Sequence, residues 1–304
     1  MLFVAAIIWG FAFVAQSTGG DVVGPYTFNS VRSVIGSAVL IPVMLLMDHF
    51  GFGRKPETTE EKKTLWCGGI LCGLAVTFAS NLQQLGITYG DSAGKAGFLT
   101  ACYIIFVPIL GIFLHKKCKA HIWICVLIAV VGLYLLCLSD TLKPEWSDLL
   151  VLLSAVCYAV QIMVVSHYAP MVDGVRLSSI QFLTCAVLSA VPMIFTEVGF
   201  QMETVSAWGR SFLSWSAWIP LLYAGVMSCG IAYTLQIFGE KDVNPAIASL
   251  VMSFESVFSV LGAWLLLGEQ LTPRQLLGCV LIFIAVVLAQ IDMEILLSKK
   301  NHAL

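Results

Sequence analysis

Residues 244–289 read NPAIASLVMSFESVFSVLGAWLLLGEQLTPRQLLGCVLIFIAVVLA. They hold two apolar segments long enough to cross a bilayer, joined by the polar hinge GEQLTPRQ. Glu255 lies about 11 residues into the first segment, which at a rise of ~1.5 Å per residue is ~16 Å from the helix start. That depth is near the middle of a hydrocarbon layer ~30 Å thick. A carboxylate there is costly, and Glu255 is therefore a candidate functional residue.

The composition of the whole chain agrees with a membrane protein. Of its 304 residues 59% are hydrophobic and 11% are charged, and the mean hydropathy is +0.92. Soluble domains carry roughly 25% charged residues. The chain is therefore predicted to be an all-α polytopic membrane protein. The formal net charge of -2 gives no indication of a nucleic-acid partner. The cysteines form no CxxC pair and are interpreted as small packing residues.

Ten apolar segments can be marked, and most have the roughly 20 residues that a span needs. The first is interpreted as a membrane helix and not as a signal peptide, because no basic region or small-residue cleavage site accompanies it. The predicted segments are 2–18, 26–47, 65–89, 93–114, 121–139, 148–168, 177–196, 216–238, 245–267 and 273–291.

The distribution of lysine and arginine predicts the orientation. The loops that follow the even-numbered segments, together with the C-terminal tail, carry eleven of these residues, against four on the opposite side. The cluster HKKCKAH at 115–121 is the sharpest single marker. Because basic residues favour the cytoplasmic side, we expect a multi-pass protein of the plasma membrane with both termini in the cytoplasm.

An internal repeat is the main organisational prediction. Trp9 aligns with Tyr158 at an offset of 149 residues, and Gln83 aligns with Gln236 at an offset of 153. The fourth and ninth segments align at a similar offset. Each repeat then has five helices, and an odd number makes the second copy enter the membrane from the opposite side. Such inverted repeats are typical of secondary transporters, which bind substrate near the midplane between the halves.

The repeat also defines the predicted domains. They are a first five-helix repeat, a linker, a second five-helix repeat and a cytoplasmic tail, at 1–139, 140–143, 144–291 and 292–304.

Two pairs of repeat-related residues are predicted near the midplane. Glu255 aligns with Tyr103, and Trp9 aligns with Tyr158. Aromatic walls offer apolar and cation–π contacts, and the acid could bind an ammonium group or carry a proton. The alternative is that these aromatic residues fill helix–helix interfaces.

Four further polar residues are candidates for the substrate pathway, each with a structural alternative. Gln83 and Gln236 could line the pathway or join helices by hydrogen bonds. Lys95 could attract a carboxylate at the outer mouth or extend to the interface. Arg32, ~10 Å below the outer end of its segment, could bind an anion or pair with backbone carbonyl groups.

Signals of an enzyme are missing from the sequence. It contains no HExxH, GxSxG or P-loop pattern. The five histidines are scattered, so their spacing suggests no metal site. We therefore expect no enzymatic activity, no cofactor and no metal.

Several stretches of the chain resemble the EamA-type transporters of the drug/metabolite transporter superfamily. They are AAIIWGFAFVAQ in helix one, PYTFNSVRSVIGSAVLIP in helix two, NLQQLGITYGDSAGKAGFLTACYIIFVPIL across helices three and four, and SFESVFSVLGAWLLLGEQLTPRQLLGCVLIFIAVVL near the end. The resemblance covers essentially the whole chain. It implies two inverted five-helix halves around a central pathway, and export or uptake of small metabolites such as amino acids.

One position departs from the family pattern. The acidic residue that often ends helix nine is present as Glu269, but its counterpart in helix four is replaced by HKK at 115–117. If that pair has a shared role, the first half has lost it.

Together these features predict a secondary transporter that moves a small organic metabolite, an amino acid or a drug-like solute, by alternating access, with export as the expected direction. The expected partners are that solute, the lipid bilayer and, as a candidate coupling ion, the proton. A passive facilitator is the main alternative. A receptor or scaffold that transports nothing and a membrane-embedded enzyme are weaker ones. The sequence leaves the oligomeric state open.

Overall fold

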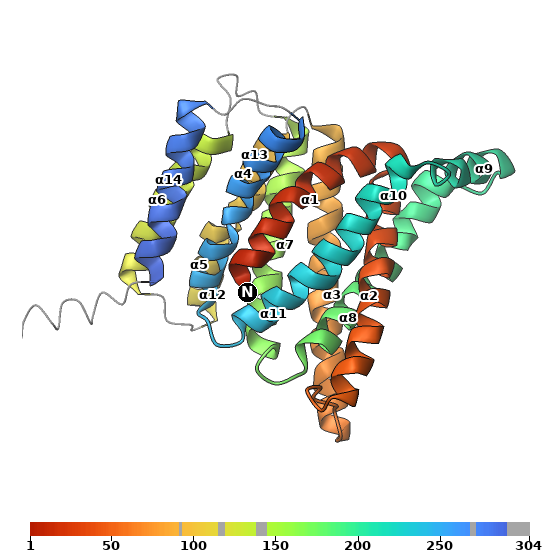
Figure 1. Ribbon diagram of the computed structural model, residues 1–304, viewed down its shortest axis with the longest axis horizontal. Coiled ribbons are helices and arrows are strands. Elements are labelled where there is room, and N and C mark those ends of the chain that lie inside the picture. The colour runs from red at the N-terminus through yellow and green to blue at the C-terminus, as the bar shows by residue number, and fades with distance from the viewer. Residues whose placement is uncertain (91–92, 115–118, 138–144, 268–271, 291–304) are drawn as a thin grey trace, which may run out of the picture.

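The computed structural model describes residues 1–90, 93–114, 119–137, 145–267 and 272–290, and within these ranges it contains helices and no strand (Figure 1). The helices of the first half are α1 (Leu2–Val23), α2 (Pro25–His49), α3 (Thr59–Tyr89), α4 (Ala93–Ala101), α5 (Tyr103–Phe113) and α6 (Ala120–Cys137). The predicted linker 140–143 and the tail 292–304 lie outside the described residues.

The second half follows the same order with more interruptions. Its helices are α7 (Trp146–Tyr168), α8 (Gly174–Met193), α9 (Met202–Ser211), α10 (Trp215–Leu222), α11 (Tyr233–Glu240), α12 (Pro245–Met252), α13 (Phe254–Leu267) and α14 (Pro273–Gln290). Two π-helical stretches continue the helices that precede them, η1 (Ile194–Val198) after α8 and η2 (Tyr223–Ala232) between α10 and α11.

These elements combine into membrane-length helices. In the part of the chain that is described, eight spans are long and apolar enough to cross a bilayer, and two shorter apolar helices accompany them, Ala120–Leu136 and Pro273–Ala289. Each falls on one of the ten segments marked in the sequence. The predicted all-α, ten-helix membrane architecture is therefore confirmed.

The fourth and ninth predicted segments are each broken into two helices, which the sequence did not predict. The breaks fall at Cys102 and Ser253. The Cys102 thiol donates to the carbonyl of Phe98 at 3.4 Å, and the Ser253 hydroxyl donates to the carbonyl of Leu250 at 2.7 Å. Such side-chain bonds to the preceding turn compete with the helical ladder and bend helices.

A carboxylate from the second half fixes the start of α2. Gly24, with a positive φ of 91°, makes the turn between α1 and α2. Glu197 accepts the backbone N–H groups of Tyr26 at 2.8 Å and Thr27 at 2.6 Å. These are orphan donors of the first helical turn, and a negative charge is favourable there. The contact joins residues about 170 positions apart in the sequence.

The helices pair between the halves in a regular way. α2 packs against α8, and α6 against α14. α1 contacts α13 and η2, while α7 contacts α5 and α3. Exchanging the two predicted repeats leaves the α2–α8 and α6–α14 pairings unchanged and turns the two contacts of α1 into the two contacts of α7. This favours the predicted two-fold relation between the halves, which stays a prediction.

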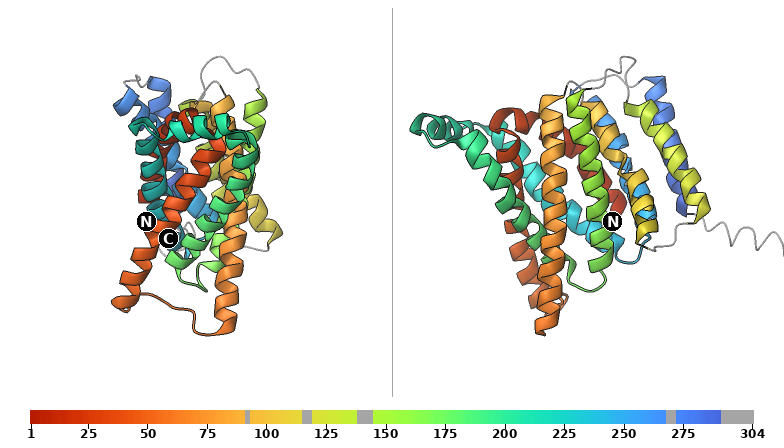
Figure 2. Two further views of the ribbon diagram at one scale, coloured as in Figure 1. Left: turned by 90° about the vertical axis from the view of Figure 1, so that its right-hand side faces the viewer. Right: turned by 180° about the vertical axis from the view of Figure 1, so that it is seen from behind.

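The pair α6 and α14 lies side by side at one end of the molecule, and α9 projects at the opposite end (Figures 1 and 2). The two helices approach closely at Gly132 and Gly278. A Cβ atom added at Gly278 would lie 2.6 Å from the Gly132 carbonyl oxygen and 2.7 Å from the Leu136 amide nitrogen. Small residues are what allow helix backbones to pack this closely in membranes.

We predict that Gly278→Ala destabilises the protein, because the new methyl group would meet backbone atoms that cannot rotate away. The expected loss is about 1–3 kcal/mol of unfolding free energy, the usual range for an overpacked core. Thermal unfolding in detergent measures it. Gly209→Ala is the control, since a Cβ there would meet nothing within 4 Å. Equal unfolding temperatures for the two variants would contradict the close contact.

Candidate functional site

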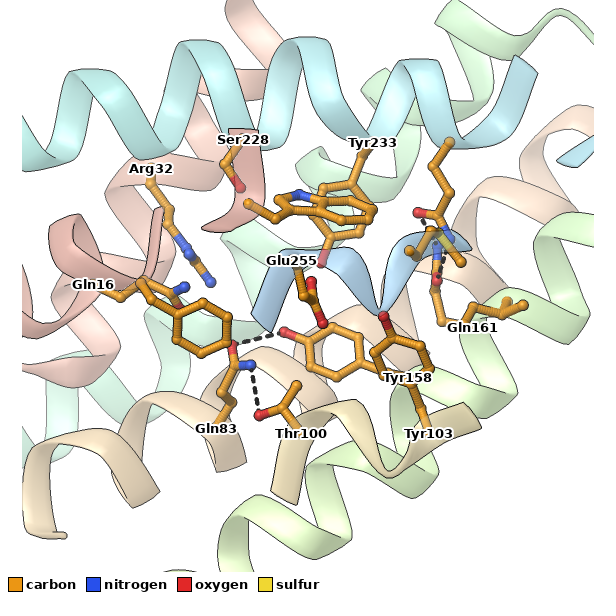
Figure 3. A pocket seen from close by; sticks show the side chains of 15 residues that line it. Gln16, Arg32, Gln83, Thr100, Tyr103, Tyr158, Gln161, Ser228, Tyr233 and Glu255 are labelled. Carbon is orange, nitrogen blue, oxygen red and sulfur yellow. Dashed lines mark hydrogen bonds between the residues drawn. The ribbon is translucent and has the colours of Figure 1, made fainter. Parts of the chain in front are cut away.

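A cavity lies in the middle of the helix bundle and is lined by residues from both halves of the chain (Figure 3). The empty space in it, including space that is open to solvent, is about 500 Å³. Aromatic and polar side chains together form the wall. They are Trp9, Phe13, Gln16, Arg32, Gln83, Thr100, Tyr103, Tyr158, Gln161, Ile162, Ser228, Tyr233, Gln236, Met252 and Glu255.

The cavity brings together seven of the eight residues that the sequence placed on a substrate pathway. They are Trp9, Arg32, Gln83, Tyr103, Tyr158, Gln236 and Glu255. The eighth, Lys95, belongs to α4, but its side chain lies outside the described residues, as does Glu269. The role of the seven in transport stays a prediction, whereas their convergence on one cavity is observed.

Glu255 stands at the centre of the cavity. The break at Ser253 begins a new helix, and Glu255 is in its first turn. Figure 3 shows its carboxylate between Tyr233 on one side and Tyr103 and Tyr158 on the other. The residue is 7% exposed. Among the described residues, neither its Oε1 atom nor the Tyr103 hydroxyl has a hydrogen-bond partner.

Arg32 faces the same cavity from α2 and is 5% exposed. Its guanidinium carbon lies 5.4 Å from the centre of the Phe28 ring, which gives a cation–π contact. Its Nε atom has no hydrogen-bond acceptor, and no carboxylate of the described chain lies within 4.0 Å of the guanidinium. Within the described ranges of the chain, the cavity therefore holds a cation and an acid that are paired neither with each other nor with another ion.

Hydrogen bonds between α3, α4 and α7 fix the wall beside Glu255. The Tyr158 hydroxyl donates to Gln83 Oε1 at 3.0 Å, and Gln83 Nε2 donates to the Thr100 hydroxyl at 3.1 Å. Gln83 therefore orients Tyr158 towards the cavity. The two functions that the sequence left as alternatives for Gln83, lining and interhelical bonding, are combined in one side chain.

A second network occupies the other end of the cavity. Gln236 Nε2 donates to Gln161 Oε1 at 3.1 Å and to Glu240 Oε1 at 2.7 Å. Gln161 Nε2 also donates to Gln181 Oε1 at 3.3 Å. These residues come from α7, α8 and α11 and are almost completely buried. A buried amide network of this kind stabilises the arrangement as long as its members stay paired.

Several lining residues were missed in the sequence. Tyr233 packs edge-on against Trp9, with ring centroids 4.8 Å apart, and so extends the aromatic wall around Glu255. Gln16 and Ser228 also face the cavity. Glu240, a member of the network of Gln236 and not of the cavity wall, was missed as well, although it stands one turn after Gln236 and thus on the same helix face.

Comparison with known proteins places the chain in a family. The model of the EamA-like transporter family matches residues 1–138 and 145–290. The chain belongs to the EamA-like transporter family. Members of this family are membrane transporters and not enzymes, and this protein is accordingly a multi-pass membrane transporter.

Three relatives of this EamA-like transporter carry the word transporter in their names. The chain is 26% identical over 291 residues to an "Uncharacterized transporter" of Archaeoglobus fulgidus, covering 95% of this chain and 84% of the relative. "Uncharacterized transporter YoaV" of Bacillus subtilis is 23% identical, covering 91% and 90%. "Uncharacterized inner membrane transporter YedA" of Escherichia coli is 22% identical, covering 98% and 92%.

The fold is also shared with a solved crystal structure. It superposes with a TM-score of 0.73 over 95% of this chain and 94% of the other, at 20% sequence identity. At this identity the likeness shows the fold alone.

We predict that Tyr158→Phe destabilises the protein by about 1–3 kcal/mol, because Gln83 Oε1 then stays buried without a donor. The change removes one oxygen atom and leaves the ring in place. Chemical or thermal unfolding measures the loss. Tyr89→Phe, at an exposed tyrosine, is the matched control. The hydrogen bond would be refuted if Tyr158→Phe unfolded at the temperature of the wild-type protein.

Proposed function

We propose that this EamA-like transporter binds a small organic solute in the central cavity and exports it across the plasma membrane by alternating access. The observation that carries the proposal is the pair Glu255 and Arg32, two buried ionic side chains without ionic partners in the described protein, which face one cavity between the halves. Burying an unpaired charge is costly. The cost is explained if the two residues are retained because they bind a polar solute.

Alternating access requires that the two ends of the cavity open in turn. The network of Gln161, Gln181, Gln236 and Glu240 holds α7, α8 and α11 together at one end. By the distribution of basic residues, this end faces the cytoplasm. We propose that it separates to admit the solute.

The breaks in the fourth and ninth spans suggest where the backbone angles change when the cavity opens. Cys102 directly precedes Tyr103, and Ser253 lies two residues before Glu255. Element ends of this kind can take up changes in backbone angles at low cost. Rotation at the breaks would move Tyr103 and Glu255 together with the half-helices that carry them, and would couple solute binding to the opening of the cavity.

We predict that Glu255→Gln lowers solute flux in proteoliposomes at least ~10-fold, which corresponds to about 1.4 kcal/mol, or abolishes its pH dependence. The substitution keeps the shape of the side chain and removes the charge that binds a cationic group or a coupling proton. Flux is measured over a series of external pH values.

Glu203→Gln is the matched control for this experiment, because Glu203 is exposed on α9 and does not line the cavity. It is expected to transport like the wild-type protein. Full transport by Glu255→Gln with unchanged pH dependence would eliminate the proposed role of Glu255.

Two other functions remain as outcomes of the same assay. A passive facilitator would show flux that does not change when an ionophore collapses the proton gradient, whereas a proton-coupled carrier would lose its uphill transport. A receptor or scaffold would show no flux of any solute.

A further inference from the structure

We infer that the solute is a zwitterion, whose cationic group binds at Glu255 and whose anionic group binds at Arg32. The inference rests on the proposed function, because it concerns the solute of the same cavity. It goes further, because it assigns a charge to each end of the solute. The observation behind it is that Glu255 and Arg32 face the same cavity and have no ionic partner among the described residues.

The surroundings of Glu255 suit an ammonium group. Tyr103, Tyr158 and Tyr233 lie around it, and Trp9, which packs against Tyr233, also lines the cavity. Ring faces attract cations, and they do so more strongly where water is excluded. The unpartnered Glu255 Oε1 and the Tyr103 hydroxyl oxygen are two acceptors for N–H donors of the solute. A carboxylate surrounded by rings therefore offers a cation both an ion pair and cation–π contacts.

The surroundings of Arg32 suit a carboxylate or another planar oxyanion. A guanidinium group presents its N–H donors in a fork that matches such anions. Among the described residues no carboxylate contacts this guanidinium group. The ring of Phe28 lies beside it and supplies no anion. Figure 3 shows Arg32 directed into the cavity at some remove from Glu255, beside Gln16 and Ser228.

The combination favours a zwitterion over a singly charged solute. A solute with only a cationic group would leave the Arg32 guanidinium buried and uncompensated, and a solute with only an anionic group would leave Glu255 uncompensated unless its carboxyl group took up a proton. A buried charge without a counter-ion is costly. A zwitterion satisfies both ions and leaves the net charge of the occupied cavity unchanged.

The first experiment lets the protein select its solute. Proteoliposomes that contain the transporter, and liposomes without it, are incubated with a water-soluble metabolite extract, and the solutes that enter are identified by mass spectrometry. We expect the solutes enriched by the protein to carry both charges. Enrichment of singly charged or neutral solutes alone would overturn the inference and leave the proposed function intact. If no solute entered, both would fall.

The second experiment tests whether the protein recognises both the cationic and the anionic group of the solute. The twenty proteinogenic amino acids, their methyl esters and their N-acetyl derivatives are tested as competitors of the transported zwitterion. The methyl ester lacks the carboxylate, and the N-acetyl derivative lacks the ammonium group. In the wild-type protein we expect competing amino acids to be at least ~10-fold more potent than either derivative, about one order of magnitude in affinity. Equal potency of an amino acid and both derivatives would contradict the inference.

Variants then link each charge to its residue. Arg32→Gln should remove the preference for the amino acid over its methyl ester, and Glu255→Gln should remove the preference over the N-acetyl derivative. Arg32→Lys should restore part of the first preference, since it keeps the positive charge. Arg210→Gln and Glu203→Gln on α9 are matched controls outside the cavity. Loss of both preferences together in either single variant would overturn the assignment of the ends.

Fluorescence-detected gel filtration of each variant shows whether it is folded. If Arg32→Gln is not folded, Arg32→Lys takes its place in the comparison. The lysine keeps the charge but loses the fork of donors, so a reduced preference for the amino acid over its methyl ester is expected. An unchanged preference in Arg32→Lys would then count against the bidentate contact.

Discussion

The burial of Glu255 and Arg32 among membrane-length helices is the constraint on which the cavity depends. A membrane-embedded ion needs a partner, access to water or a functional reason. The described protein gives each of these two ions aromatic neighbours and no counter-ion. The surrounding polar side chains then have to be held in place by other means, and hydrogen bonds such as the one between Tyr158 and Gln83 do this. The result is a polar cavity enclosed by apolar helices.

The architecture explains how these side chains reach one place. α2 brings Arg32 and α13 brings Glu255, from opposite halves of the chain. Close packing of α6 against α14 at Gly132 and Gly278 stabilises the bundle. Glu197 joins the second half to the start of α2 by hydrogen bonds. We propose that a small relative rotation of the two halves widens the cavity at their junction at one end or the other. This is the physical basis of the proposed alternating access.

Much of the fold could be predicted from the sequence, because hydropathy alone decides where helices cross a bilayer. The breaks at Cys102 and Ser253 could not, since small polar side chains occur in many helices that stay straight, and bending depends on the tertiary contacts around them. Depth in the membrane identified Glu255 and Tyr103 as cavity candidates. It could not identify Tyr233 or Gln16, because depth does not tell which face of a helix looks inwards. Glu240 could have been found from its spacing, because it stands one turn after Gln236 on the same helix face.

The most direct test of this account is a structure of the transporter with its solute bound. The account predicts density for the solute in the central cavity, with a cationic group in contact with Glu255 and an anionic group in contact with Arg32. Density for the solute at another place, with both side chains still lacking an ionic partner, would contradict it.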